Sequence, residues 1–138
     1  MNAKRFLALD VGERRTGVAA TDWTGTICVP LDRIDHSGMK ELPDRVAPLL
    51  AERQSEVLVV GVPLGRDGAA GSQARKVLAL VDVLRKRFQD LEIMTVDEAH
   101  TTDEAHRLMK DAGIRAARRR RHADSLSALQ ILRRVVGD

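Results

Sequence analysis

The sequence predicts a single α/β domain with a ribonuclease-H-like fold, in which helices flank a mixed five-stranded sheet. Two patterns carry this prediction. The first part of the chain reads as three strands joined by short turns, which is typical of an antiparallel meander. The remainder alternates between short apolar runs and segments with helical spacing, which is typical of parallel strand–helix units. The 138 residues are enough for one domain, residues 1–138, with a sizeable core.

Five strands are predicted, each as a short segment bounded by turn residues. The third contains Pro30, which favours the edge of the sheet because proline donates no ladder hydrogen bond. Helices are predicted after the third and fourth strands, and Ser72 is expected to cap the second of them. The predicted strands comprise residues 6–11, 16–21, 26–34, 57–62 and 93–96.

Two more helices are expected after the fifth strand. Thr101 followed by Glu104 is a capping box that starts the first of them, and Gly113 ends it. The arginine run at residues 118–121 is expected to be a loop or the start of the last helix. From Leu126 onward, apolar residues recur at helical spacing and line that helix.

The composition limits the class of protein. Apolar residues make up 43% of the chain and charged residues 31%, as in ordinary globular proteins, and no apolar run approaches the ~20 residues of a membrane span. The first residues lead directly into strand-like sequence, so no signal peptide is expected. Cys28 is the single cysteine, which excludes an internal disulfide and a cysteine-rich zinc site. We therefore expect a cytoplasmic protein without membrane association.

The net charge of +3 is unevenly distributed. Residues 101–122 contain seven basic and three acidic side chains, a net charge of +4, so the rest of the chain carries −1. A local basic segment of this kind is expected of a phosphate-binding edge, although it is also compatible with a solvated face. Aromatic residues are only 2% of the chain, which favours recognition of nucleic-acid backbone and shape over stacking of unpaired bases. The arginines expected to contact nucleic acid are Arg14, Arg15, Arg118, Arg119, Arg120 and Arg121.

Asp10 is the strongest single indication of a catalytic site. It interrupts an otherwise apolar strand, where a charged and unpaired carboxylate costs several kcal/mol. We interpret it as a metal ligand. The alternative is an aspartate that caps the turn at Gly12 or pairs with Arg14 or Arg15. The neighbouring glycines also fit the phosphate-binding turn of actin-like ATPases and sugar kinases, but those proteins need two lobes, which 138 residues do not supply.

Two further acids complete the candidate site. Glu98 directly follows the fifth strand, and Asp124 lies in the first turn of the last helix, where the helix dipole alone would also favour an acid. With Asp10 they can converge at one end of the sheet, and clustered carboxylates repel one another unless cations neutralise them. Mg²⁺ or Mn²⁺ is the expected cofactor, because a pair of such ions can activate a water for phosphodiester cleavage.

The third ligand has two alternatives. In the usual sheet order the fifth strand is two strands away from the first, a gap of roughly 10 Å. Asp97 or Asp67 would then compete with Glu98 for the metal. Glu98 is preferred because successive strand residues point to opposite faces and because its side chain is longer. The four histidines are expected to be ordinary surface or helix residues.

Four motifs in matching order and spacing indicate a family. Residues 6–19 read Phe-Leu-Ala-Leu-Asp-Val-Gly-Glu-Arg-Arg-Thr-Gly-Val-Ala, and residues 59–64 read Val-Val-Gly-Val-Pro-Leu. Val-Asp-Glu at residues 96–98 and Asp124 within the last helix supply the other two. With these motifs the chain resembles the bacterial pre-16S ribosomal RNA nucleases, also described as RuvX-like Holliday junction resolvases.

The resemblance implies a ribonuclease H fold, a divalent metal, acids at Asp10, Glu98 and Asp124, and processing of the 5′ end of precursor small-subunit ribosomal RNA. The chain departs from the family pattern at Ala99, where arginine is usual, and at Ser127, where alanine is usual. The first departure removes a phosphate or carboxylate partner from the neighbourhood of Glu98.

Three functions are compatible with this sequence. The first is a nuclease acting on precursor ribosomal RNA. The second is a resolvase acting on four-way DNA, which should be a homodimer because it cuts two strands together. The third is a non-catalytic nucleic-acid-binding module with the same fold, which the alanine at position 99 would support.

Overall fold

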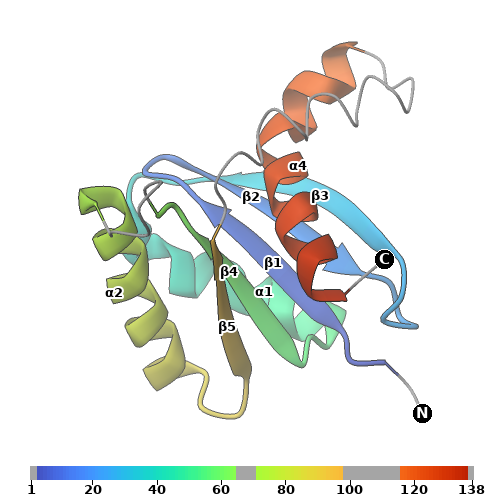
Figure 1. Ribbon diagram of the computed structural model, residues 1–138, viewed down its shortest axis with the longest axis horizontal. Coiled ribbons are helices and arrows are strands. Elements are labelled where there is room, and N and C mark those ends of the chain that lie inside the picture. Colours follow the sequence, from blue (N-terminus) through green and yellow to red (C-terminus); the bar gives the residue numbers. More distant parts are fainter. Residues whose placement is uncertain (1–2, 65–70, 98–115, 137–138) are drawn as a thin grey trace.

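The computed structural model describes residues 3–64, 71–97 and 116–136 (Figure 1). Five strands form one mixed sheet in the order β3-β2-β1-β4-β5, with helices on both faces. The strands are β1 (Phe6–Val11), β2 (Arg15–Thr21), β3 (Cys28–Asp35), β4 (Val57–Val62) and β5 (Glu92–Asp97). The helices are α1 (Leu42–Arg53), α2 (Ser72–Arg87) and α4 (Ala116–Val136), with a short 3₁₀ helix η1 (Met39–Glu41) before α1.

The sheet topology confirms both patterns that were read from the sequence. β1, β2 and β3 form an antiparallel meander, whereas β1, β4 and β5 pair in parallel. β3, which contains Pro30, lies at the edge of the sheet, as predicted. β4 separates β5 from β1, so the fifth strand is two strands away from the first, as expected.

Side-chain alternation along the strands divides the core into two layers. Leu7 and Leu9 of β1 belong to the larger cluster with residues of α1 and α2, whereas Ala8 belongs to the cluster under α4. β4 is buried along its whole length because both faces are covered, which explains its uninterrupted apolar sequence. Ala8 and Ala19 are strand residues on the α4 side, and their small side chains let this helix lie close to the sheet.

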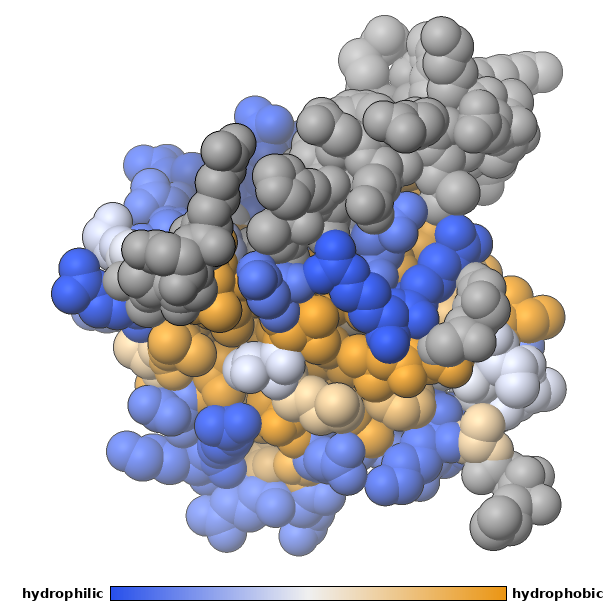
Figure 2. Space-filling view, in the orientation of Figure 1, coloured by the Kyte–Doolittle hydropathy of each residue, from blue (hydrophilic) through white to orange (hydrophobic). Residues whose placement is uncertain are grey.

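The helix α4 packs across β1, β2 and β3 on one face of the sheet (Figure 1). On the same face, Figure 2 shows hydrophobic surface between α2 and α4, over β5, bordered by hydrophilic residues. Met94 and Val96 of β5 are half-buried in the α4-side cluster. This face of the sheet is therefore apolar as far as its edge strand.

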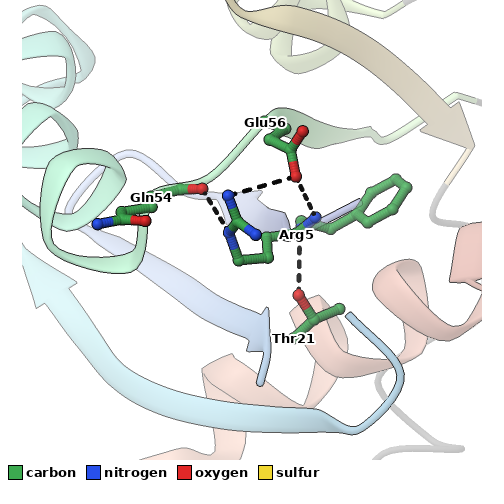
Figure 3. A network of polar contacts seen from close by, with 5 residues as sticks. Arg5, Thr21, Gln54 and Glu56 are labelled. Carbon is green, nitrogen blue, oxygen red and sulfur yellow. Dashed lines mark hydrogen bonds and ion pairs between the residues drawn. The ribbon is translucent and has the colours of Figure 1, made fainter. Parts of the chain in front are cut away.

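A network of polar contacts around Arg5 fixes the end of β1 that is far from Asp10 (Figure 3). The Arg5 side chain donates to the carbonyl oxygen of Gln54 (2.9 Å) and pairs with Glu56 (3.5 Å), just before β4. The backbone N–H of Phe6 donates to Oγ1 of Thr21 (2.9 Å) at the end of β2. Three strands are thus held in register at this end, which also determines what lies beside Asp10 at the other.

The structure corrects one expectation and completes another. Ser72 does not cap α2, because Gly71 is the N-cap residue and no side-chain cap bond is present there. The arginine run at residues 118–121 lies within the first turns of α4, and so belongs to a helix rather than a loop. The helix predicted to start at Thr101 lies outside the described residues. Of the helices that the structure describes, none combines the length and apolar character that crossing a bilayer requires.

Candidate functional site

Asp10 lies near the end of β1 on the face of the sheet that α4 covers. The alternation along β1 places it on the same side as Ala8, and its side chain is half-buried. Its register partners are Gly17 on β2 and Gly61 on β4. Because glycine has no side chain, the two strands that flank Asp10 place nothing beyond backbone beside its carboxylate.

The Asp10 carboxylate has no protein partner within the described part of the chain. Neither a hydrogen bond nor an ion pair to it is found there, although other surface acids are paired, such as Glu13 with Lys76. The alternative in which Asp10 pairs with Arg14 or Arg15 is therefore not what the structure contains. A half-buried carboxylate without a partner is an uncommon arrangement, and its oxygen lone pairs are available to a ligand.

One hydrogen bond anchors α4 beside Asp10. The pairing of β2 with β3 shifts register between Thr16 and Val18, and at this irregularity the backbone N–H of Val18 donates to Oγ of Ser125 (3.2 Å). Both bonded residues are fully buried. Val18 pairs with Leu9, the residue before Asp10, so the bond brings this turn of α4 over the strand pair that carries Asp10.

The backbone at position 124 directly precedes Ser125, the α4 residue that is bonded to Val18 on the strand next to β1. The side chain of Asp124, like those of Arg118, Arg119, Arg120 and Arg121, falls outside the residues whose side chains the structure describes, and Glu98 falls outside the described residues altogether. Within the described ranges, no cluster of three or more metal-ligating side chains is present. The assignment of the three acids to one metal site stays a prediction.

Asp97 and Glu98 compete for the third position, and the alternation along β5 bears on this choice. Val96 lies in the same row across the sheet as Gly61 and Asp10, and it packs in the α4-side cluster. Asp97 is the next residue and shares the alternation of Ile93, which packs against the opposite cluster. Asp97 thus belongs to the face that points away from Asp10. Asp67, the other alternative, lies outside the described residues.

Two of the expected arginines lie at the Asp10 end of the sheet, Arg14 in the turn between β1 and β2 and Arg15 as the first residue of β2. Arg14 and Arg15 are both exposed, and the carbonyl oxygen of Arg14 accepts a hydrogen bond from the backbone N–H of His36 (2.9 Å). The turn is tight at Gly12, where an added Cβ would lie 2.4 Å from the carbonyl oxygen of Arg15. Glycine is required there because no side chain fits so close to the backbone.

The expectation for His36 was wrong. It is buried just after β3, with 8% of its surface exposed, and its Nε2 shares a 2.9 Å hydrogen bond with Oγ1 of Thr16. Its burial follows from the packing of the β3 end against the β1–β2 turn, which local sequence does not reveal. Ser125 was also missed as an anchoring residue. The sequence did contain a signal for it, because Ser125 stands where the apolar spacing of the last helix predicts a buried residue.

Comparison with known proteins identifies the family. The profile of the RuvX family, described as Holliday junction resolvase, matches residues 4–137. The chain belongs to the RuvX family. The family resemblance read from the four sequence motifs is thereby confirmed.

Two relatives show how close other RuvX-like sequences are. A protein of Fusobacterium nucleatum subsp. nucleatum named "Putative pre-16S rRNA nuclease" is 36% identical over 130 residues, which are 94% of each chain. A protein of Roseiflexus sp. (strain RS-1) with the same name is 41% identical over 128 residues, covering 93% of this chain and 90% of the relative.

Solved structures confirm the fold of this RuvX-family chain. RuvC of T. thermophilus, solved in complex with a Holliday junction substrate, aligns with a TM-score of 0.60 at 16% identity and covers 96% of this chain and 93% of its own. The Fowlpox virus resolvase, solved with Holliday junction DNA, aligns with a TM-score of 0.62 at 10% identity and covers 96% and 97%. At these identities the likeness concerns the fold, which is ribonuclease-H-like as predicted.

Proposed function

We propose that this protein is a metal-dependent nuclease that cleaves phosphodiester bonds in structured nucleic acid, with precursor 16S ribosomal RNA as its substrate. The observation that carries the proposal is the half-buried carboxylate of Asp10, which has no partner among the described residues and is flanked by two glycines in a RuvX-family chain. Leaving such a group without a protein partner costs stability, so its presence favours a functional role.

The residues present suit a hard divalent cation. Carboxylate oxygens are the ligands that Mg²⁺ and Mn²⁺ prefer, and Asp10 offers both of its oxygens. In the proposal Glu98 and Asp124 complete the set, Glu98 from the end of β5 and Asp124 from α4. The bound ions would activate a water and stabilise the leaving oxygen of the phosphodiester.

The basic residues have a separate task in the proposal. Arg14 and Arg15 lie exposed at the same end of the sheet as Asp10, where they can hold phosphates that flank the scissile bond. The arginine run at residues 118–121 would extend this interaction along the first turns of α4. Because these arginines bind phosphate rather than base edges, they favour recognition of shape over sequence.

The choice of RNA as substrate follows the names of the relatives, which are called pre-16S rRNA nucleases. A second candidate is cleavage of four-way DNA junctions, and the description of the RuvX family as Holliday junction resolvase favours it. Precursor ribosomal RNA would place the protein in the cytoplasm. A resolvase would in addition require a symmetric dimer, because the two cuts are made in strands related by a two-fold axis.

The test is a cleavage assay with precursor 16S RNA and with a four-way DNA junction, each in Mg²⁺, Mn²⁺ or EDTA. Asp10→Asn should abolish cleavage while its circular dichroism spectrum and its binding to nucleic acid stay close to those of the wild type. Glu98→Gln should lower the rate strongly. Asp97→Asn is the matched control, because this neighbouring acid lies on the opposite face and its amide variant should keep nearly full activity.

The outcomes separate the three functions. Metal-dependent cleavage of the RNA alone supports the first candidate, and paired cuts in the junction by a dimer support the second. If wild-type protein binds either substrate but cuts neither in the presence of metal, the chain is a binding module. If Asp10→Asn cleaves as fast as the wild type, the site has been misassigned.

A further inference from the structure

A groove of about 640 Å³ lies on the face of the sheet opposite to Asp10. Three segments form its walls: the β1–β2 turn at Glu13 and Arg14, the segment that runs from Ser37 through η1 to Pro43, and α2 between Lys76 and Val83. The volume falls within the range of roughly 300–1,000 Å³ that small-molecule sites occupy in proteins. None of the acids of the proposed metal site is among the described residues that line the groove, and Arg14 is the residue that it shares with the proposed phosphate-binding surface.

The floor of the groove is apolar. Met39 and Pro43 line it from the side of η1 and α1, and Ala79, Leu80 and Val83 line it from α2. Val83 leaves 51% of its surface exposed, although large apolar side chains of a surface helix usually face the core. Burying this surface would be favourable for any ligand with an apolar body.

The rim of the groove carries an excess of positive charge. Arg14, Lys40 and Lys76 line it, and Glu13 is the single acid among the lining residues that are described. Nζ of Lys76 pairs with Glu13 at 2.9 Å, and this hydrogen-bonded pair lowers the pKa of the Glu13 carboxyl. No ion pair of Arg14 or Lys40 is found within the described ranges, so both cations are available to an anion.

We propose that this groove binds a small anionic ligand with an apolar body. Its carboxylate, phosphate or sulfonate group would contact Arg14 and Lys40, and its apolar part would cover Val83 and the floor. Single-stranded nucleic acid fits less well, because such strands are held by aromatic rings on which bases stack and none of the described lining residues is aromatic. The proposal does not depend on nuclease activity.

The experiment uses the full chain and a pair of dyes that differ in one charged group. 8-Anilinonaphthalene-1-sulfonate is the anionic probe, and N-phenyl-1-naphthylamine is the same ring system without the sulfonate. Fluorescence titration should give saturable binding of the anionic dye at one site, roughly tenfold tighter than that of the neutral dye, since only the sulfonate can accept charge-assisted hydrogen bonds from the two cations. Inorganic sulfate alone should not displace the dye at equal concentration.

Substitutions then locate the site. Val83→Glu places a carboxylate on the floor and should weaken binding of the anionic dye by roughly tenfold or more. Leu78→Glu is the matched control on the same helix, because Leu78 is also exposed but does not line the groove, and binding should change by less than about twofold. Lys40→Gln removes one rim cation at an exposed position, and it should weaken the anionic dye by roughly threefold or more while the neutral dye binds as before.

Two results would overturn the proposal. If Val83→Glu and Leu78→Glu affect the anionic dye equally, the dye binds apolar surface without using the groove. If the two dyes bind with the same affinity, or if Lys40→Gln weakens both equally, the cations do not select an anion. Thermal unfolding of each variant shows whether weaker binding reflects a loss of fold, and Lys40→Gln keeps the test decisive should Val83→Glu fail to fold.

Discussion

Removing the hydroxyl of Ser125 tests whether α4 is anchored over β1 and β2 as the structure indicates. In Ser125→Ala the backbone N–H of Val18 is left without its acceptor, while both positions stay fully buried. A buried donor without a partner costs about 1–3 kcal/mol. With a urea dependence of about 2 kcal/mol per molar, the unfolding midpoint should fall by roughly 0.5–1.5 M.

The measurement is urea unfolding combined with hydrogen exchange of the Val18 amide. Exchange at Val18 should accelerate about tenfold for each 1.4 kcal/mol of lowered stability. Ser55→Ala is the control, because the Ser55 hydroxyl is buried and has no hydrogen-bond partner in the part of the chain that the structure describes. Its removal should leave the midpoint unchanged or raise it. Cleavage by Ser125→Ala should also fall, since the adjoining turn of α4 carries Asp124.

An anchoring role for this bond is excluded if Ser125→Ala and Ser55→Ala unfold at the same urea concentration and the Val18 amide exchanges at its wild-type rate. The bond would then contribute nothing, and the position of α4 would depend on its apolar packing alone. A lowered midpoint with unchanged exchange at Val18 would also count against it, because the destabilisation would then arise elsewhere in the molecule.

Three further predictions rest on the same geometry. Gly12→Ala should lower the free energy of unfolding by roughly 1–3 kcal/mol and reduce cleavage, because the added Cβ would lie 2.4 Å from the carbonyl oxygen of Arg15. Gly38→Ala is the control: a Cβ there meets nothing within 4 Å, so thermal unfolding and cleavage should not change. Lys76→Met should raise the pKa of Glu13 towards its ordinary value of 4.5, as measured by NMR titration. Because Lys76 lowers this pKa in the folded state, the pair stabilises the fold fully above pH 4.5, and this stabilisation is lost as the pH falls through the lowered pKa. Replacing the arginines at residues 118–120 with alanine should weaken nucleic-acid binding for all sequences and flatten its salt dependence by about one unit of slope for each phosphate that is no longer bound, and an unchanged slope would mean that these arginines form only a solvated face.

Local sequence was sufficient to predict where the two neighbouring strands β1 and β4 begin and end. β1 and β4 begin and end at the predicted residues, because a charged residue, Arg5 or Glu56, precedes each run and a turn residue, Gly12 or Pro63, follows it. β2 starts one residue earlier than expected, at Arg15, β3 starts later, at Cys28, and β5 extends by one residue at each end, to Glu92 and Asp97. These differences arise at strand ends, where backbone pairing and the apolar pattern do not stop at the same residue.

The candidate site, too, was predictable from the sequence only in part. The carboxylate of Asp10 stands out in the sequence because it interrupts an apolar run, and its place on a buried strand needed no further information. Its surroundings did not follow from the sequence. Gly17 and Gly61 are neighbours of Asp10 only because β2 and β4 pair with β1 in one particular register, and the register depends on interactions at the far end of the strands, such as those of Arg5.

Periodicity, one proline and one charge in an apolar run were enough to predict the order of strands and helices along the chain, the edge position of β3 and the choice of Asp10. Each of these signals acts through local backbone geometry and hydration, so it can be read from a short segment. Three features required the folded chain: Asp10 pairs with no arginine among the described residues, Asp97 faces away from it, and His36 and Ser125 are buried. Each of them depends on which distant residues come together, and that is set by the packing of helices and strands on one another rather than by any single segment.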